Sequence, residues 1–170
     1  IANQALKLES STLKPYVREG AWLEGQSAEN NKRMGLFLGV AQGNGKETEH
    51  APRMVEMVYT PANGNYTKTV LLVGKGILFD TGGNNLKASS DPATGKAYIH
   101  GMQGDMAGAA SVIGRLKLID QLQLEGVRVV GLAPLTENRI GPDATLPGDI
   151  HTARNGKTVV ISNTDAEGRL

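Results

Sequence analysis

The chain has 170 residues, of which 39% are hydrophobic and 21% are charged, and this composition is typical of a globular protein large enough to bury a core. Its 18 basic and 17 acidic residues leave a formal net charge of +1, which gives no electrostatic support for nucleic-acid binding. Because the sequence has no cysteine, it excludes disulfides, thiol nucleophiles and cysteine-based zinc sites.

The first third of the chain predicts helices followed by strands. Residues 6–32 are polar with widely spaced apolar side chains, which favours one or two helices broken at Pro15 and Gly25. The apolar run Met34–Val40 predicts a short buried strand, and the Met, Val and Tyr residues of Met54–Thr60 predict another. We therefore expect a helical lead-in over residues 1–33 and one domain from residue 34 onward.

The remaining segments predict an α/β sheet. Thr69–Asp80 is an almost continuous apolar run, which is typical of a strand buried on both faces, and it is much shorter than the roughly 18 residues of a membrane helix. Met106–Gln123 has helical apolar spacing, and Gly126–Leu135 predicts the next strand. The order strand, helix, strand requires a crossover and indicates an α/β fold. Asn155-Gly156 predicts the turn of a later hairpin.

Polar residues that could take part in catalysis or metal binding lie within the long apolar run and at its end. Open α/β sheets carry their functional sites at strand ends. Lys75 lies inside the run and would be a buried cation unless it is neutralised or loses its proton. Asp80 ends the run, and Thr81-Gly82-Gly83 gives the chain a sharp exit. The residues alone leave an alternative open, in which Lys75 reaches solvent and Asp80 caps a turn.

Three further acidic residues follow at separate points of the chain. Asp105 directly precedes the predicted helix, where an N-cap and a metal ligand are both compatible with an aspartate. If the chain is extended around residues 163–170, Asp165 and Glu167 point to one side, where their charges repel unless a proton or a cation neutralises them. Together these three residues and Asp80 carry about the charge that a pair of divalent cations would cancel. For residues 163–170 the alternative is an Asp helix N-cap with a surface Glu and a surface Arg.

Four segments stand out when they are taken together. They are Val73–Gly83, Met102–Ala110, Pro147–Ile150 and Asn163–Leu170. In order and rough spacing they resemble the leucine aminopeptidase (cytosol aminopeptidase) family of dinuclear-metal aminopeptidases, and the last segment is that family's signature. The resemblance runs from about residue 34 to residue 170. It implies an α/β catalytic domain with a central mixed sheet flanked by helices, of which this chain would be the N-terminal portion, truncated at its C-terminal end.

The resemblance also implies an activity and a site. The activity is that of a metal-dependent aminopeptidase, which releases N-terminal amino acids from peptides by a metal-bridged hydroxide, with two divalent ions per chain, Zn or Mn. The residues that match the ligands of the first ion are Lys75, Asp80, Asp105 and Glu167, and those of the second are Asp80, Asp165 and Glu167. A lysine ligand must be neutral, and two nearby cations in a buried strand would depress its pKa.

Three other residues match family members that contact the substrate or the reaction. Lys87 matches a protonated lysine that stabilises the developing oxyanion, and Arg169 matches an arginine that holds a bicarbonate acting as general base. Met102 matches a wall of the pocket for the first side chain. The loop from residue 88 to 101 is longer than the family pattern, with an inserted turn expected at Asp91–Gly95.

The expected partners are peptide substrates, with no membrane and no nucleic acid, and the full-length protein would be a cytoplasmic homo-hexamer by the same resemblance. A second interpretation is a metal-binding homologue without catalysis, which serves a scaffold or DNA-binding role. The presence of Lys87 and Arg169 beside every expected metal ligand favours the enzyme, because a scaffold needs neither residue.

Overall fold

A computed structural model describes residues 1–45, 48–88, 90 and 93–170 of the chain. The described chain divides into two compact units that interleave in sequence. The first unit comprises residues 1–18, 53–76 and 106–135, and the second comprises 19–52, 77–105 and 136–170. The domain division expected near residue 33 stays a prediction.

The first unit is built on a mixed sheet. Its strands are β1 (Leu13–Arg18), β2 (Arg53–Tyr59), β3 (Tyr66–Val73) and β5 (Gly126–Asn138), in the order β1-β2-β5-β3. β1 and β5 both run antiparallel to β2, whereas β3 runs parallel to β5. The parallel pair requires a crossover, and the helix predicted over Met106–Gln123 supplies it as α3 (Ala107–Leu122).

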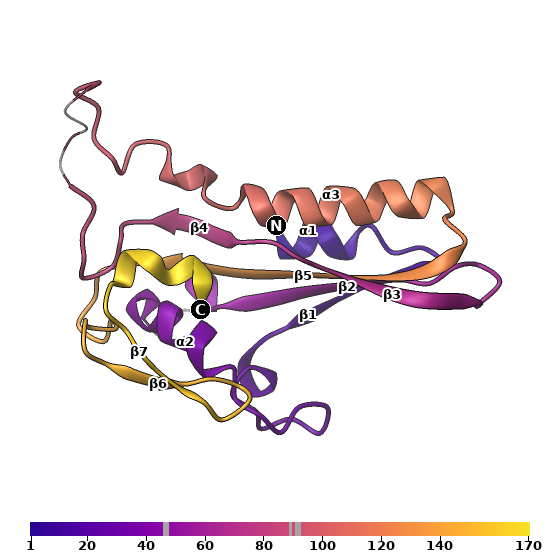
Figure 1. Cartoon of the computed structure of the whole chain (residues 1–170), viewed down its shortest axis with the longest axis horizontal. Helices are drawn as coiled ribbons and strands as arrows, with labels where there is room; N and C mark the ends of the chain where they lie inside the picture. Colours follow the sequence, from indigo (N-terminus) through magenta and orange to yellow (C-terminus); the bar gives the residue numbers. More distant parts are fainter. Residues whose placement is uncertain (46–47, 89, 91–92) are drawn as a thin grey trace. The chain divides into compact units, whose positions relative to one another are not determined.

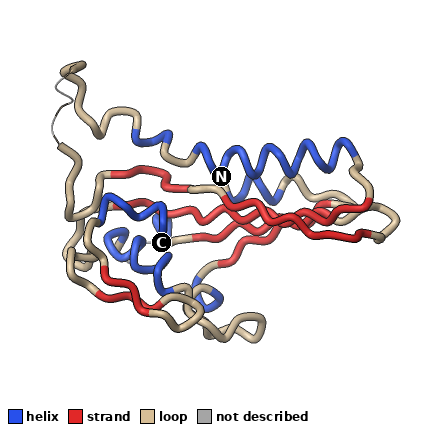
Figure 2. Tube along the Cα trace, in the orientation of Figure 1, coloured by secondary structure: helices blue, strands red, loops and turns tan. Residues whose placement is uncertain are grey.

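The helices α1 (Ala2–Leu6) and α3 lie along the same face of this sheet (Figures 1 and 2). The α3 side chains that are buried follow the helical spacing of Ala109, Val112 and Leu116. Val112 and Leu116 pack over Gly131 of β5, where an added Cβ would meet their side chains at 2.8 and 2.9 Å. The residue paired with Gly131 is Met57, which is 1% exposed. The core of the first unit therefore lies between α3 and this face.

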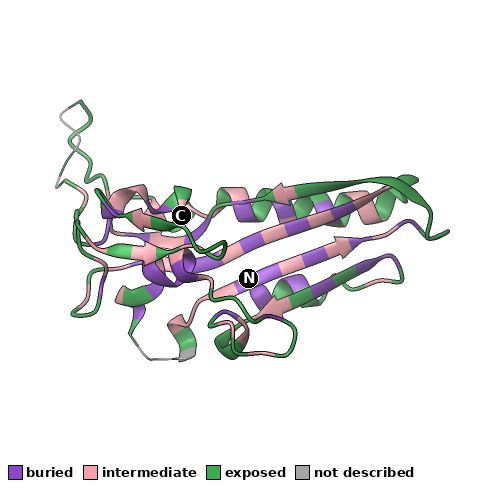
Figure 3. Cartoon of the chain, turned by 60° about the horizontal axis from the view of Figure 1, so that its bottom comes forward, coloured by how far each residue is buried: buried purple, intermediate pink, exposed green. Residues whose placement is uncertain are grey.

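Burial alternates along the inner strands, as Figure 3 shows. The opposite sheet face is more open, because Leu71 and Val73 of β3 are 58% and 64% exposed. The expectation of one strand buried on both faces over Thr69–Asp80 is therefore wrong. The run is two strands, β3 and β4 (Gly76–Asp80), which separate at Gly74 and Lys75 because the backbone of Gly74 lies against that of Gly108 in α3.

The second unit contains short elements. β4 pairs with β5, whose last residues belong to this unit, and β6 (Ile150–Thr152) and β7 (Thr158–Val160) form the hairpin predicted at Asn155-Gly156. The helices are α2 (Gly35–Ala41) and the 3-10 helices η1 (Gly20–Trp22), η2 (Gln42–Asn44), η3 (Thr48–His50), η4 (Met102–Gly104) and η5 (Thr164–Arg169). None of the helices in the described ranges is long and apolar enough to cross a membrane.

Two further element predictions are wrong. Met34–Val40 is not a strand, because Phe37, Leu38 and Ala41 are buried at helical spacing in α2. Residues 13–18, expected in a lead-in helix, form the edge strand β1, and Pro15 is tolerated there because an edge strand needs fewer N–H donors. The inserted turn expected at Asp91–Gly95 begins outside the described residues.

Candidate metal centre

The carboxylate of Asp80 lies at the tip of β4, as the sequence predicts, and it is 2% exposed. The sharp exit after it depends on Gly82 and Gly83, whose φ angles of +89° and +64° lie in the left-handed region. The Gly82 N–H donates to Asp80 Oδ1 at 2.9 Å. The alternative in which Asp80 caps a turn is therefore correct for this hydrogen bond. The second carboxylate oxygen, Oδ2, contacts Lys87 instead.

The segment that carries Asp165 and Glu167 is the 3-10 helix η5, so the condition of an extended chain does not hold there. Asn163 caps this helix, because its Oδ1 accepts from the Asp165 N–H at 2.8 Å. Thr164 fastens the helix to the turn after β4, since its Oγ1 donates to Gly82 O at 2.6 Å and accepts from Asn85 N–H at 2.7 Å. A side chain at Gly83 would not fit beside these hydrogen bonds, because its Cβ would lie 3.0 Å from Thr164 Oγ1.

Three carboxylates from separate segments meet in the second unit. Asp80, Asp105 and Glu167 each offer an oxygen, and these oxygens all lie within 4.8 Å of one another. Asp80 and Glu167 are buried and Asp105 is half-buried, so their mutual repulsion is poorly screened by water. Oxygen donors at this spacing suit a divalent cation, which would cancel that repulsion. Asp105 does not cap α3, whose N-cap is Met106.

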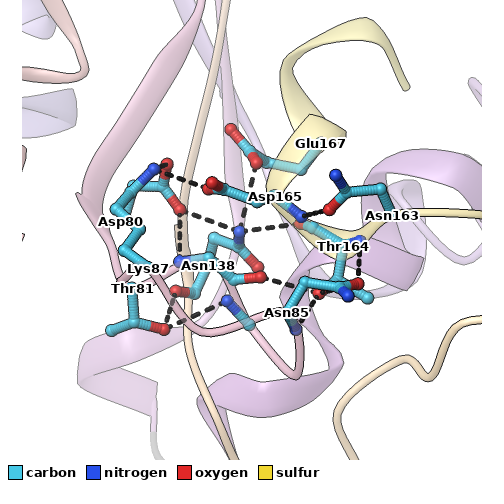
Figure 4. Close-up of polar contacts among 11 residues, drawn as sticks. Asp80, Thr81, Asn85, Lys87, Asn138, Asn163, Thr164, Asp165 and Glu167 are labelled. Atoms are coloured by element: carbon cyan, nitrogen blue, oxygen red, sulfur yellow. Dashed lines mark hydrogen bonds and ion pairs between the residues drawn. The ribbon is translucent and has the colours of Figure 1, made fainter. Parts of the chain in front are cut away.

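Lys87 supplies a positive charge at the same cluster (Figure 4). Its Nζ lies 2.8 Å from Asp80 Oδ2 and 2.5 Å from Asp165 Oδ1. Burial alone would lower the pKa of the Lys87 ammonium, but the hydrogen bonds to Asp165 and Asp80 outweigh burial and raise that pKa above its ordinary value. Burial likewise would raise the pKa of the Asp80 carboxyl, yet the hydrogen bonds from Lys87, Gly82 and Asn138 hold it below its ordinary value. The pair is ionised at neutral pH.

Sequence reasoning missed Asn138, the last residue of β5. Its Nδ2 donates to Asp80 Oδ1 at 2.8 Å, to Thr164 O at 3.0 Å and to Glu167 Oε2 at 3.1 Å (Figure 4). The available signal was its position three residues after the predicted strand Gly126–Leu135, but nothing in the sequence distinguishes it from the neighbouring Thr136 and Glu137.

Beside the carboxylates lies an open cavity of about 330 Å³, lined by Lys87, Ala88, Tyr98, Met102 and Asp165. Met102 therefore lies on the same cavity as two of the charged residues, with Tyr98 as a second nonpolar wall that the sequence did not single out. A cavity with apolar walls and a charged edge has room for a small side chain next to the carboxylates.

Two further predicted residues, Lys75 and Arg169, are exposed. Lys75 belongs to the first unit, between β3 and β4, and it is exposed, so the alternative in which Lys75 reaches solvent is correct and the expectation of a buried cation is wrong. Its backbone O accepts from Ala109 N–H at 2.8 Å. Arg169 is exposed in the last turn of η5. The metal role of Lys75 and the bicarbonate role of Arg169 stay predictions.

Comparison with known proteins agrees with the resemblance read from the sequence. Residues 2–170 match the model of the cytosol aminopeptidase family, catalytic domain. The chain is 47% identical over 137 residues to a probable cytosol aminopeptidase of Synechococcus sp. (strain CC9311), covering 81% of this chain and 25% of the relative. It is 39% identical over 170 residues to the cytosol aminopeptidase of Rattus norvegicus, covering all of this chain and 29% of the relative. The chain thus spans little more than a quarter of the length of these curated relatives.

Proposed function

Because the chain belongs to the cytosol aminopeptidase family, we propose that the protein that contains it is a metal-dependent aminopeptidase acting on the free N-terminus of peptides. The observation that carries this proposal is the meeting of three carboxylates, those of Asp80, Asp105 and Glu167. Lys87 and Asp165 form an ion pair that lines an open cavity beside them. Clustered carboxylates are costly unless a cation compensates them, and a cavity beside the cation gives a substrate access to it.

The metal ligands are proposed from the family resemblance, and the meeting of Asp80, Asp105 and Glu167 supports part of the assignment. We assign one divalent ion, Zn or Mn, to Lys75, Asp80, Asp105 and Glu167, and a second to Asp80, Asp165 and Glu167. When bound, such a pair supplies a water that ionises near neutral pH and a Lewis acid for the scissile carbonyl. Since Lys75 is exposed in this chain, the neutral amine that a lysine ligand needs depends on the ions themselves rather than on burial.

The residues around the ions would orient the substrate and balance charge. Lys87 stays protonated, because its two carboxylate partners raise its pKa, and it can donate to the oxygen that becomes negative as the carbonyl is attacked. Met102 and Tyr98 give the cavity apolar walls for the side chain of the first residue. Arg169, exposed on η5, would hold the bicarbonate that acts as general base.

The wider properties of the protein are proposed on the resemblance alone. They are peptide substrates, a cytoplasmic location and assembly as a homo-hexamer in the full-length protein.

A paired substrate assay tests the activity. The full-length protein, loaded with manganese or zinc, should release ammonia from leucine amide and should leave N-acetyl-leucine amide intact, because an aminopeptidase needs a free substrate amine. The matched control is the same protein after chelation. If metal binds but neither amide is hydrolysed, the protein is a homologue without catalysis, as in the scaffold interpretation. If both amides are hydrolysed equally, it is not an aminopeptidase.

A further inference from the structure

The side chain of Asn138 occupies the centre of the candidate site, although it carries no charge (Figure 4). It is 4% exposed, and its single amide nitrogen has three acceptors within hydrogen-bond distance: Asp80 Oδ1, Glu167 Oε2 and Thr164 O. An amide nitrogen has two hydrogens, so at least one of them is shared between two acceptors. One small group therefore links the end of β4 to the helix η5.

The main chain of Asn138 is tied to the same turn. Its backbone O accepts from the Thr81 N–H and from Thr81 Oγ1, each at 2.9 Å. Its Oδ1 lies where a Cβ on Gly83 would be only 2.9 Å away, so the turn after Asp80 closes directly onto the amide. The position of Asn138 is thus fixed from both its backbone and its side chain.

These contacts determine where the carboxylate oxygens lie. Asp80 Oδ1 accepts two N–H groups, from Gly82 and Asn138, while Oδ2 lies on the cation Lys87. Glu167 is held through Oε2. Groups that hydrogen-bond to metal ligands fix the orientation of those ligands, and losing such a group typically costs about 10 to 100-fold in metal affinity. An amide does this without adding charge, whereas a carboxylate in its place would add repulsion.

We propose that Asn138 is the positioning residue that aligns Asp80 and Glu167 for divalent-ion binding. The proposal rests on the proposed function, because it assumes that these two carboxylates bind metal. The amide itself does not bind the ion or the substrate. It holds two side chains from distant parts of the sequence at a spacing that their mutual repulsion would otherwise widen.

The competing explanation is that Asn138 only stabilises the fold. Asn44 offers a matched control, because it is another buried asparagine of the second unit, and its Nδ2 donates to His50 O at 3.1 Å and to Thr136 Oγ1 at 2.8 Å. Neither of these partners is an acidic residue. Asn138→Leu and Asn44→Leu both remove buried amide hydrogen bonds at similar volume, but only the first touches the carboxylates.

The test measures manganese affinity of the chelated full-length protein by calorimetry, with free manganese followed by electron paramagnetic resonance. Asn138→Leu should bind about 10 to 100-fold more weakly than wild type, and Asn44→Leu as tightly as wild type. Asn138→Ser, which is smaller and polar, decides the matter if the leucine variant does not fold, and it should also bind more weakly.

The possible results separate this inference from the proposed function. If a folded Asn138 variant binds manganese as tightly as wild type, or if Asn44→Leu weakens binding equally, the positioning role is wrong while the proposed function stands. If wild type itself binds no divalent ion, the proposed function fails, and the positioning role fails with it.

Discussion

In the metal-free protein Lys87 should act as the internal counter-ion of the carboxylate cluster, so Lys87→Met should destabilise that state. The Lys87 side chain is 14% exposed, and its partners Asp80 and Asp165 are 3% and 29% exposed. Breaking a buried ion pair costs about 3–5 kcal/mol, because it leaves a charge without compensation. Since Asp165 keeps some contact with water, we expect a loss of about 3 kcal/mol in the free energy of unfolding, at the lower end of that range.

The assay is urea unfolding of the full-length protein in a chelator, compared with the same experiment at saturating manganese. Bound cations replace the lost charge, so the effect of Lys87→Met should shrink when metal is present. The control is Lys14→Met, whose ion pair with Glu9 at 3.0 Å has exposed side chains, and it should cost less than about 1 kcal/mol. The reasoning is refuted if Lys87→Met costs no more than Lys14→Met in chelator, or costs as much with metal as without it.

Three further predictions concern packing, pH and turnover. An added Cβ at Gly108 in α3 would lie 2.7 Å from the Lys75 backbone N, so Gly108→Ala should lower the free energy of unfolding by about 1–3 kcal/mol, whereas Gly114→Ala, with open space around it, should raise it by up to about 1 kcal/mol in the same urea titration. Burial, then the charges of Asp120 and Glu125, raise the pKa of Tyr59, so the stability that its neutral form contributes is present below about pH 10 and is lost as pH rises through the folded pKa. In urea titrations at rising pH, the difference in the free energy of unfolding between wild type and Tyr59→Phe should fall by at most about 1.4 kcal/mol per pH unit. A difference that stays constant with pH would contradict the raised pKa. Arg169→Ala should lower kcat by about two orders of magnitude in a leucine amide assay while metal content stays unchanged, and loss of metal would show that its role is structural.

The parts of the fold that the sequence predicted are those with a strong local signal. The helix α3 shows its buried stripe in the spacing of Ala109, Val112 and Leu116, and the β6–β7 hairpin has the Asn155-Gly156 turn. Local signals failed where a short apolar run fits two structures, as in α2. They also failed between β3 and β4, because the break there is imposed by contact of Gly74 with Gly108, which is distant in sequence.

In the candidate site, too, the residues with a local sequence signal could be predicted and those that depend on distant contacts could not. The acidic residues could be predicted because each one adjoins glycines or belongs to the family's signature, and the structure brings Asp80, Asp105 and Glu167 together. Asn138 could not, because its importance comes from acceptors on two distant segments. The exposure of Lys75 is one of two alternatives that the residues leave open, since a continuous apolar run conceals the break in the strand.

Metal stoichiometry measured together with turnover tests the central claim most directly. The full-length protein is chelated, manganese is added stepwise, and bound metal and leucine amide hydrolysis are measured on the same samples. We expect activity to be absent after chelation and to reach its maximum at two ions per chain, because clustered carboxylates need that much positive charge to form a working site. Full activity with one ion per chain, or activity that survives complete chelation, would contradict the dinuclear account.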